Sequence, residues 1–71
     1  MWTIDDDGDA FNADTDQFIS CGKLGNGFAV FMTFSGKGLK VLDFAFSEGR
    51  ARYLIWELVN QLNEEEARHA D

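Results

Sequence analysis

At 71 residues the chain is long enough for one small domain, and a domain of this size buries only about 60% of the surface that its unfolded chain exposes. Apolar residues make up 45% of the sequence, which excludes a wholly disordered protein, and the net charge of −7 disfavours direct binding to nucleic acid or an anionic membrane. With Cys21 as the only cysteine, an internal disulfide is excluded and we expect an intracellular protein. We find no signal-peptide pattern and no apolar run of about 20 residues, so we expect no membrane span.

Residues 1–16 form an acidic N-terminal segment without a single lysine or arginine, whose aspartates are Asp5, Asp6, Asp7, Asp9, Asp14 and Asp16. In an extended chain, alternate side chains point the same way about 6.6 Å apart, so this pattern predicts rows of like charge. An EF-hand frame starting at Asp5 puts Ala10 where the loop needs glycine, and we expect no metal site. A solvated, mobile tail is the alternative interpretation of the same aspartates.

Residues 17–46 predict a three-stranded antiparallel β-meander. Alternating apolar residues mark strands over 17–21, 28–35 and 39–46. Glycine-rich turns over 22–27 and 35–38 connect them, and the first is interpreted as a hairpin turn, because it lacks a phosphate-loop ending and leads into a strand.

Residues 47–69 predict one long α-helix, with Ser47 as its N-cap and Glu48 in the first turn. The stripe that should dock on the sheet is Ala51, Leu54, Ile55, Leu58, Val59 and Leu62. Tyr53 and Trp56 fall outside or at the edge of this stripe and are predicted to be flank or interface residues. The fold class is therefore α+β, in a single domain over 1–71, with the helix packed on one face of the meander.

The second face of the sheet is also apolar, and one helix cannot cover it. Either the N-terminal segment covers it, through Trp2, Ile4 and Phe11, or a second copy of the chain does so in a homodimer.

The remaining polar residues give no catalytic or cofactor-binding set, and we expect no enzymatic activity. Cys21 has no histidine or second cysteine near it in sequence, and His69 lies in a C-terminus expected to fray. Asp43 is expected at a sheet edge or paired with Lys40 or an arginine. Arg50 and Arg52 lie near the helix start, where cations are unfavourable, which predicts salt bridges to the aspartates.

In size and charge the whole chain resembles the small acidic anti-CRISPR proteins encoded by phages, with its aspartates in rows and the helix end Glu64, Glu65 and Glu66. The resemblance implies a cytoplasmic DNA mimic in a bacterial host cell, which blocks the DNA-binding surface of a type I CRISPR surveillance complex. It carries over no motif and no family residue.

For such an inhibitor we expect the contacts to a basic, DNA-binding partner protein to come from charged and aromatic residues. They are Asp5, Asp6, Asp7, Asp9, Asp14, Asp16, Glu64, Glu65, Glu66, Tyr53 and Trp56, with Trp2 and Phe11 as further exposed aromatic candidates. The alternative function is an antitoxin or accessory subunit that binds a basic protein without mimicking DNA.

Overall fold

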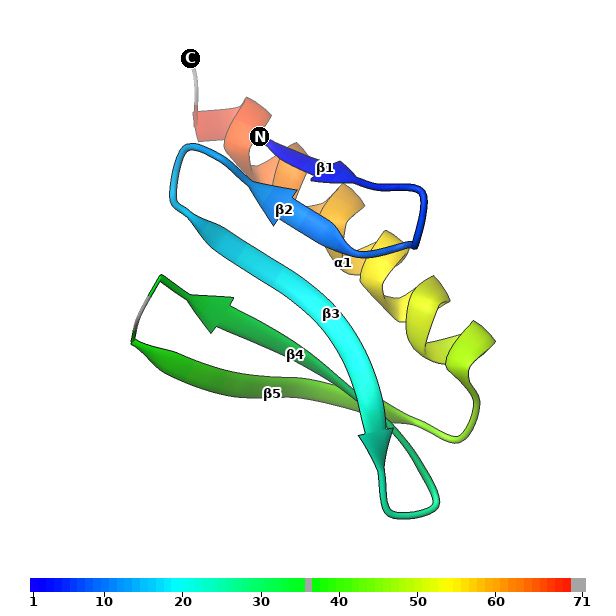
Figure 1. Cartoon of the computed structure of the whole chain (residues 1–71). Helices are drawn as coiled ribbons and strands as arrows, with labels where there is room; N and C mark the ends of the chain where they lie inside the picture. Colours follow the sequence, from blue (N-terminus) through cyan, green and yellow to red (C-terminus); the bar gives the residue numbers. More distant parts are fainter. Residues whose placement is uncertain (36, 70–71) are drawn as a thin grey trace.

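The computed structural model describes residues 1–35 and 37–69, and it is an α+β fold with one antiparallel sheet followed by one helix (Figure 1). The strands lie in the sheet in chain order, and the helix follows the last of them. The elements are β1 (Trp2–Ile4), β2 (Ala10–Asn12), β3 (Gln17–Leu24), β4 (Gly27–Phe34), β5 (Gly38–Ala45) and α1 (Glu48–His69). The class and the C-terminal helix are as predicted, but the sheet has five strands and not three.

The two additional strands come from the acidic N-terminal segment. β1 pairs with β2 between Trp2↔Asn12 and Ile4↔Ala10, and β2 continues onto β3 through Phe11↔Phe18. Both strands contain only three residues, which is too short for alternation to be distinguished from chance. The segment therefore extends the sheet at its edge, which excludes the first of the two alternatives for covering the second sheet face.

The β3–β4 hairpin turns through Gly25 and Asn26, since Leu24 pairs with Gly27. Gly25 has a φ of 58°, which suits the first central position of a two-residue hairpin turn. Between β4 and β5 the register shifts at Val30 and Phe31. Of the turn predicted over 35–38, residue 36 lies outside the described residues.

Helix α1 begins where the capping pattern predicts. Ser47 Oγ accepts a hydrogen bond from the Arg50 backbone N–H at 3.1 Å, and the Ser47 carbonyl accepts one from Ala51 N–H at 3.0 Å. The first bond satisfies a donor that a helix start leaves without an intrahelical partner, and the second is the first i→i−4 bond of the helix itself. The helix continues to His69.

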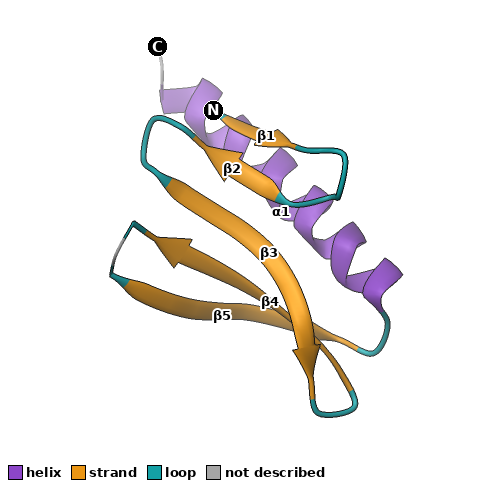
Figure 2. Cartoon of the chain, in the orientation of Figure 1, coloured by secondary structure: helices purple, strands orange, loops and turns teal. Residues whose placement is uncertain are grey.

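The core lies between α1 and one face of the sheet, as Figure 2 shows with the helix running along one side of the strands. The predicted stripe packs there: Ala51, Ile55 and Val59 are fully or almost fully buried. Trp2 belongs to this core at 6% exposure, so its assignment as an exposed aromatic is wrong. We call the opposite side of the sheet, which the helix does not cover, the outer face.

Candidate protein-binding surface

The β1–β2 turn gathers four of the aspartates in a compact loop. Asp5 Oδ1 accepts hydrogen bonds from the backbone N–H groups of Asp7 at 2.9 Å and Asp9 at 3.1 Å, and Gly8 N–H donates to the Asp5 carbonyl at 3.1 Å. Gly8 has a φ of 87°, which closes the turn. The predicted extended row is therefore wrong for these residues, because a side chain that caps its own turn favours a bend over an extended chain. Asp5, Asp6 and Asp7 remain exposed.

Asp9 differs from its neighbours because its carboxylate is used inside the fold. Asp9 Oδ1 accepts a hydrogen bond from Ser20 Oγ at 2.7 Å and another from Arg52 Nη1. Arg52 Nη2 also lies 3.4 Å from Glu48 Oε2. The predicted ion pair between this arginine and the aspartate segment is confirmed, and it ties the β1–β2 turn to the first turns of the helix.

The β2–β3 turn holds the other two aspartates. Asn12 Oδ1 accepts a hydrogen bond from Asp14 N–H at 3.0 Å, and Asp16 adopts a left-handed φ of 55°. The Met1 ammonium donates to Asp14 Oδ2 at 2.8 Å and lies 3.0 Å from Glu66 Oε1. Its hydrogen bond and charge lower the pKa of the Asp14 carboxyl.

A clamp between Trp2 and Asn63 brings these acidic segments beside the helix. The Trp2 backbone N–H donates to Asn63 Oδ1 at 2.8 Å, and Asn63 Nδ2 donates to the Trp2 carbonyl at 3.1 Å. Because Trp2 also pairs with Asn12, the start of the β2–β3 turn is held close to the last turns of α1, and Figure 1 shows the N-terminus there.

Successive helical residues are about 100° apart, so of the three C-terminal glutamates only Glu66 points toward the β1–β2 hairpin. Glu64 and Glu65 are exposed on other faces of the helix. We call the exposed carboxylates along this side the acidic flank: Asp5, Asp6, Asp7, Asp14, Asp16 and Glu66.

Two aromatic rings project from the solvent side of the helix, as predicted. Tyr53 and Trp56 are 46% and 53% exposed, and their rings stack with centroids 6.0 Å apart. The Arg50 guanidinium lies 5.1 Å from the Tyr53 centroid, so this arginine contacts an aromatic ring and not the aspartates. Hydrogen bonding to the Glu57 carboxylate raises the pKa of Tyr53. The cluster is a preformed, partly apolar surface, and Trp56 lies one helical turn after Arg52, which holds the β1–β2 turn.

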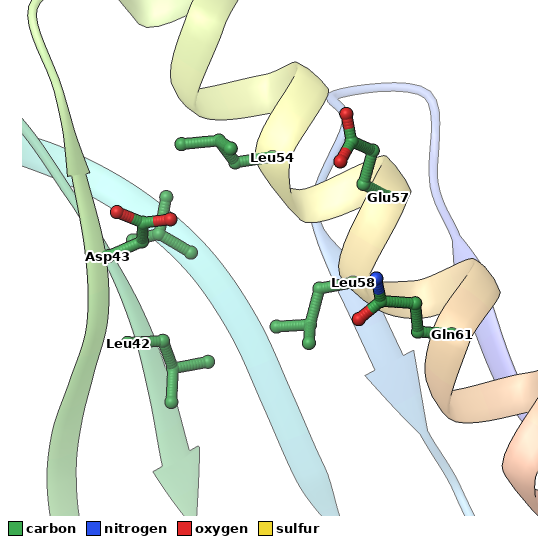
Figure 3. Close-up of a pocket in the computed structure, with 7 residues that line it drawn as sticks. Leu42, Asp43, Leu54, Glu57, Leu58 and Gln61 are labelled. Atoms are coloured by element: carbon green, nitrogen blue, oxygen red, sulfur yellow. The ribbon is translucent and has the colours of Figure 1, made fainter.

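On the other side of the helix, a shallow groove of about 360 Å³ separates α1 from β5. Figure 3 shows Leu54 and Leu58 pointing from the helix toward the strand and Leu42 pointing from the strand toward the helix. Asp43, Glu57 and Gln61 complete the described lining with Val30. Asp43 lies on the edge strand, as expected, and Asp43 Oδ1 accepts a hydrogen bond from the Phe44 N–H at 2.7 Å. The groove has an apolar floor and an acidic rim.

Within the described residues, no group of three or more His, Cys, Asp or Glu side chains is arranged to hold a metal ion. Cys21 is partly buried, and this burial raises the pKa of its thiol. Neither observation identifies a reactive centre. Over residues 1–35 and 37–69, no helix combines the length and apolar character needed to span a lipid bilayer.

Comparisons with protein families, with characterised proteins and with solved structures give no match. The site must therefore be argued from its geometry alone.

Sequence reasoning missed Trp2 as a core residue and Asn63 as the clamp. For Trp2 the sequence held a signal, because the dipeptide Asp7-Gly8 between Ile4 and Ala10 is typical of a hairpin turn. A hairpin there would bring Trp2 into the sheet. For Asn63 the only signal was its position beside the apolar stripe of the helix, which does not reveal a backbone partner 61 residues away.

Proposed function

We propose that the chain is an acidic protein-binding protein that engages a basic surface of another protein through the acidic flank. The observation that carries this proposal is that both aspartate turns are held against one helix, the β2–β3 turn through the Trp2–Asn63 clamp and the β1–β2 turn through the Asp9–Arg52 ion pair. A preformed charged surface loses little conformational entropy on binding and attracts an oppositely charged partner at long range. The stacked Tyr53 and Trp56 rings supply apolar contact area beside it.

The narrower form of the proposal is a DNA mimic that blocks the DNA-binding surface of a CRISPR surveillance complex, as an anti-CRISPR protein does. The flank runs from the Arg52 contact to Glu66, about 20 Å along the helix at 1.5 Å per residue. B-DNA carries about 12 phosphate charges over that length, about twice the number of exposed carboxylates on the flank. A mimic of this density would compete with DNA through fewer ionic contacts, and its affinity would depend less steeply on salt than that of DNA.

Asp9 is not part of the proposed contact set, because its carboxylate is paired with Arg52 and only 20% exposed. Glu64 and Glu65 are secondary candidates, since they lie on other faces of the helix. The remaining aspartates tolerate neutralisation well: asparagine keeps the oxygen with which Asp5 caps its turn, and it accepts the left-handed backbone of Asp16.

The test uses a purified type I surveillance complex and its target duplex, with binding of the complex to the duplex measured by mobility shift. In the narrower form, the protein reduces duplex binding, and changing Asp5, Asp6, Asp7, Asp14 and Asp16 to asparagine abolishes that effect without unfolding the chain. An unchanged inhibition by the asparagine variant would refute the role of the acidic flank.

A matched pair of variants separates location from total charge. Asp6→Asn and Asp43→Asn each remove one charge, but Asp43 lines the groove at the other side of the helix. We expect Asp6→Asn to weaken partner binding about threefold, and Asp43→Asn to leave it nearly unchanged. Equal losses would mean that only net charge matters.

If the surveillance complex gives no response, a pull-down from a bacterial lysate with Asp6→Asn and Asp43→Asn identifies the basic partner. If duplex DNA displaces the chain from the captured protein, the result supports mimicry. If the captured protein binds the chain and DNA at the same time, the result supports an antitoxin or accessory subunit. If it binds both variants equally well, the proposal is refuted.

A further inference from the structure

The outer face of the sheet is a continuous apolar surface without charge. Strand pairing gives every described strand residue a side, and the outer-facing aromatic and aliphatic ones lie next to one another: Phe11, Phe18, Phe31, Leu39, Val41 and Phe44. The charged strand residues Lys23, Lys40 and Asp43 all take the helix side, because they pair with Phe28, Met32 and Val30. Among the described residues, one ion pair contacts an outer-facing strand residue: Asp9, which is paired with Arg52, accepts a hydrogen bond from Ser20. The two charges of this pair neutralise each other.

The rings on this face are held in place by small residues beneath them. Phe31 Cε1 lies 3.5 Å from the position that a Cβ atom at Gly22 would take, and Phe44 Cζ lies 2.7 Å from the corresponding position at Gly27. Phe44 in turn makes an edge-to-face contact with Phe46, at 5.4 Å between centroids. Rings that cover glycine in this way form an ordered surface before any partner arrives, which lowers the entropy cost of binding.

The exposed area is large for a monomer of this size. Leu39 is 59% exposed and Val41 54%, with Phe11 at 44% and Phe44 at 41%. Phe46 follows β5 and extends this surface through its contact with the Phe44 ring, and it is 81% exposed. Taking about 200 Å² for a fully exposed aromatic side chain and somewhat less for the aliphatic ones, these five present about 500 Å². Two such faces together bury about 1,000 Å², which reaches the lower limit for a specific interface.

We propose that the outer face binds the outer face of a second copy of this chain, giving a two-fold symmetric dimer with the sheets inside and the helices outside. The charge pattern selects this occupant. A basic partner would bury its cations against phenylalanine with no carboxylate to receive them, whereas two copies place neutral surface on neutral surface.

The same arrangement keeps the acidic residues of the two copies apart. Packed sheets lie about 10 Å apart, and the aspartates of the acidic flank lie in the β1–β2 and β2–β3 turns at one edge of each sheet, while Glu66 lies on the helix outside it. At physiological salt the screening length is about 8 Å, so repulsion between the two net charges of −7 is largely screened. The inference does not depend on the acidic flank having a partner.

The test is sedimentation equilibrium of the full chain across a range of concentrations. We expect a reversible dimer, and we expect Val41→Asp to raise its dissociation constant about 100-fold or more, because the new carboxylate would be buried without a partner. Trp56→Asp, at an equally exposed position on the helix, should leave the constant unchanged. A wild-type chain that stays monomeric at millimolar concentration, or a dimer broken by Trp56→Asp and not by Val41→Asp, would overturn the proposal.

Folding of Val41→Asp is checked by its far-ultraviolet circular dichroism. Should it not fold, Leu39→Lys, at the most exposed of the large apolar residues of β5, replaces it with the same expected outcome. A mixed sample of isotope-labelled and unlabelled chains provides an independent readout. Intermolecular contacts between Phe11, Phe31 and Phe44 rings are expected, and intermolecular contacts confined to the helix would refute the model.

Discussion

Replacing Asn63 with alanine should release β1 from the helix. Asn63 makes two hydrogen bonds to the backbone of Trp2, at 2.8 and 3.1 Å, in a partly buried site. Each such bond contributes about 0.5–1.5 kcal/mol net, so their loss costs about 2 kcal/mol. A domain of this length is stable by roughly 4–10 kcal/mol in total, which makes this a large fraction.

Alanine also has a higher helix propensity than asparagine, by up to about 0.7 kcal/mol, so the control variant must contain the same Asn-to-Ala exchange on the same helix. Asn60→Ala provides it, because Asn60 is exposed on the same helix. With about 4–8 °C per kcal/mol for a chain of this size, the melting temperature of Asn63→Ala should lie about 10–15 °C below that of Asn60→Ala. Both must be measured at one protein concentration, because dimerisation would make the melting temperature concentration-dependent.

Hydrogen exchange adds a local readout at the same site. The Trp2 amide donates to Asn63, so its exchange should accelerate in Asn63→Ala, while amides in the β3–β4 hairpin keep their relative protection. Melting temperatures within about 2 °C of each other, with unchanged Trp2 exchange, would show that the clamp contributes nothing and would remove the basis for an ordered acidic flank.

Three further substitutions should change the folding stability in a direction that the structure predicts, and one prediction concerns Cys21 in the unmodified chain. Ser47→Ala removes the cap on Arg50 N–H and should destabilise the fold by about 1 kcal/mol in urea unfolding, and an unchanged midpoint would contradict the cap. Gly8→Ala should lower the free energy of unfolding by at least about 1 kcal/mol, because φ is 87° and the new Cβ would lie 2.8 Å from Arg52 Cδ. Gly49→Ala lies in open space on the helix and should raise the free energy of unfolding by up to about 1 kcal/mol. A Gly8→Ala variant more stable than Gly49→Ala would refute both. Burial raises the pKa of the Cys21 thiol above that in the unfolded chain, so folding stability should fall as pH rises above the unfolded-state value, and alkylation at pH 8 should be slower than in urea; equal rates would contradict the burial.

The long elements of this fold could be predicted from sequence because each has a strong local signal. The Ser47 cap and the apolar stripe from Ala51 to Leu62 predict the helix. The alternation of side chains between the two sheet faces in residues 28–34 predicts the strand β4. The two N-terminal strands could not be recognised in the same way. β1 pairs only with the equally short β2, and the Asn63 clamp that holds it on the helix comes from 61 residues away in the sequence.

Each acidic residue could be named as a candidate from the sequence, but its role depends on tertiary contacts that the sequence does not reveal. The six N-terminal aspartates look alike in the sequence. In the fold Asp5 caps a turn and Asp9 neutralises Arg52, and Asp6 and Asp7 have no described side-chain hydrogen bond. Arg50 and Arg52 were equally good candidates for an ion pair, and only the position of the β1–β2 turn selects Arg52.

The contact between Trp2 and Asn63 also constrains the order in which the molecule can assemble. It joins residues 61 positions apart, whereas the β3–β4 and β4–β5 hairpins join near neighbours. Local hairpins close quickly, and distant contacts pay a larger loop-closure entropy. Trp2 therefore cannot reach its place in the core until the turn of α1 that carries Asn63 has been synthesised, because that turn supplies its backbone partner.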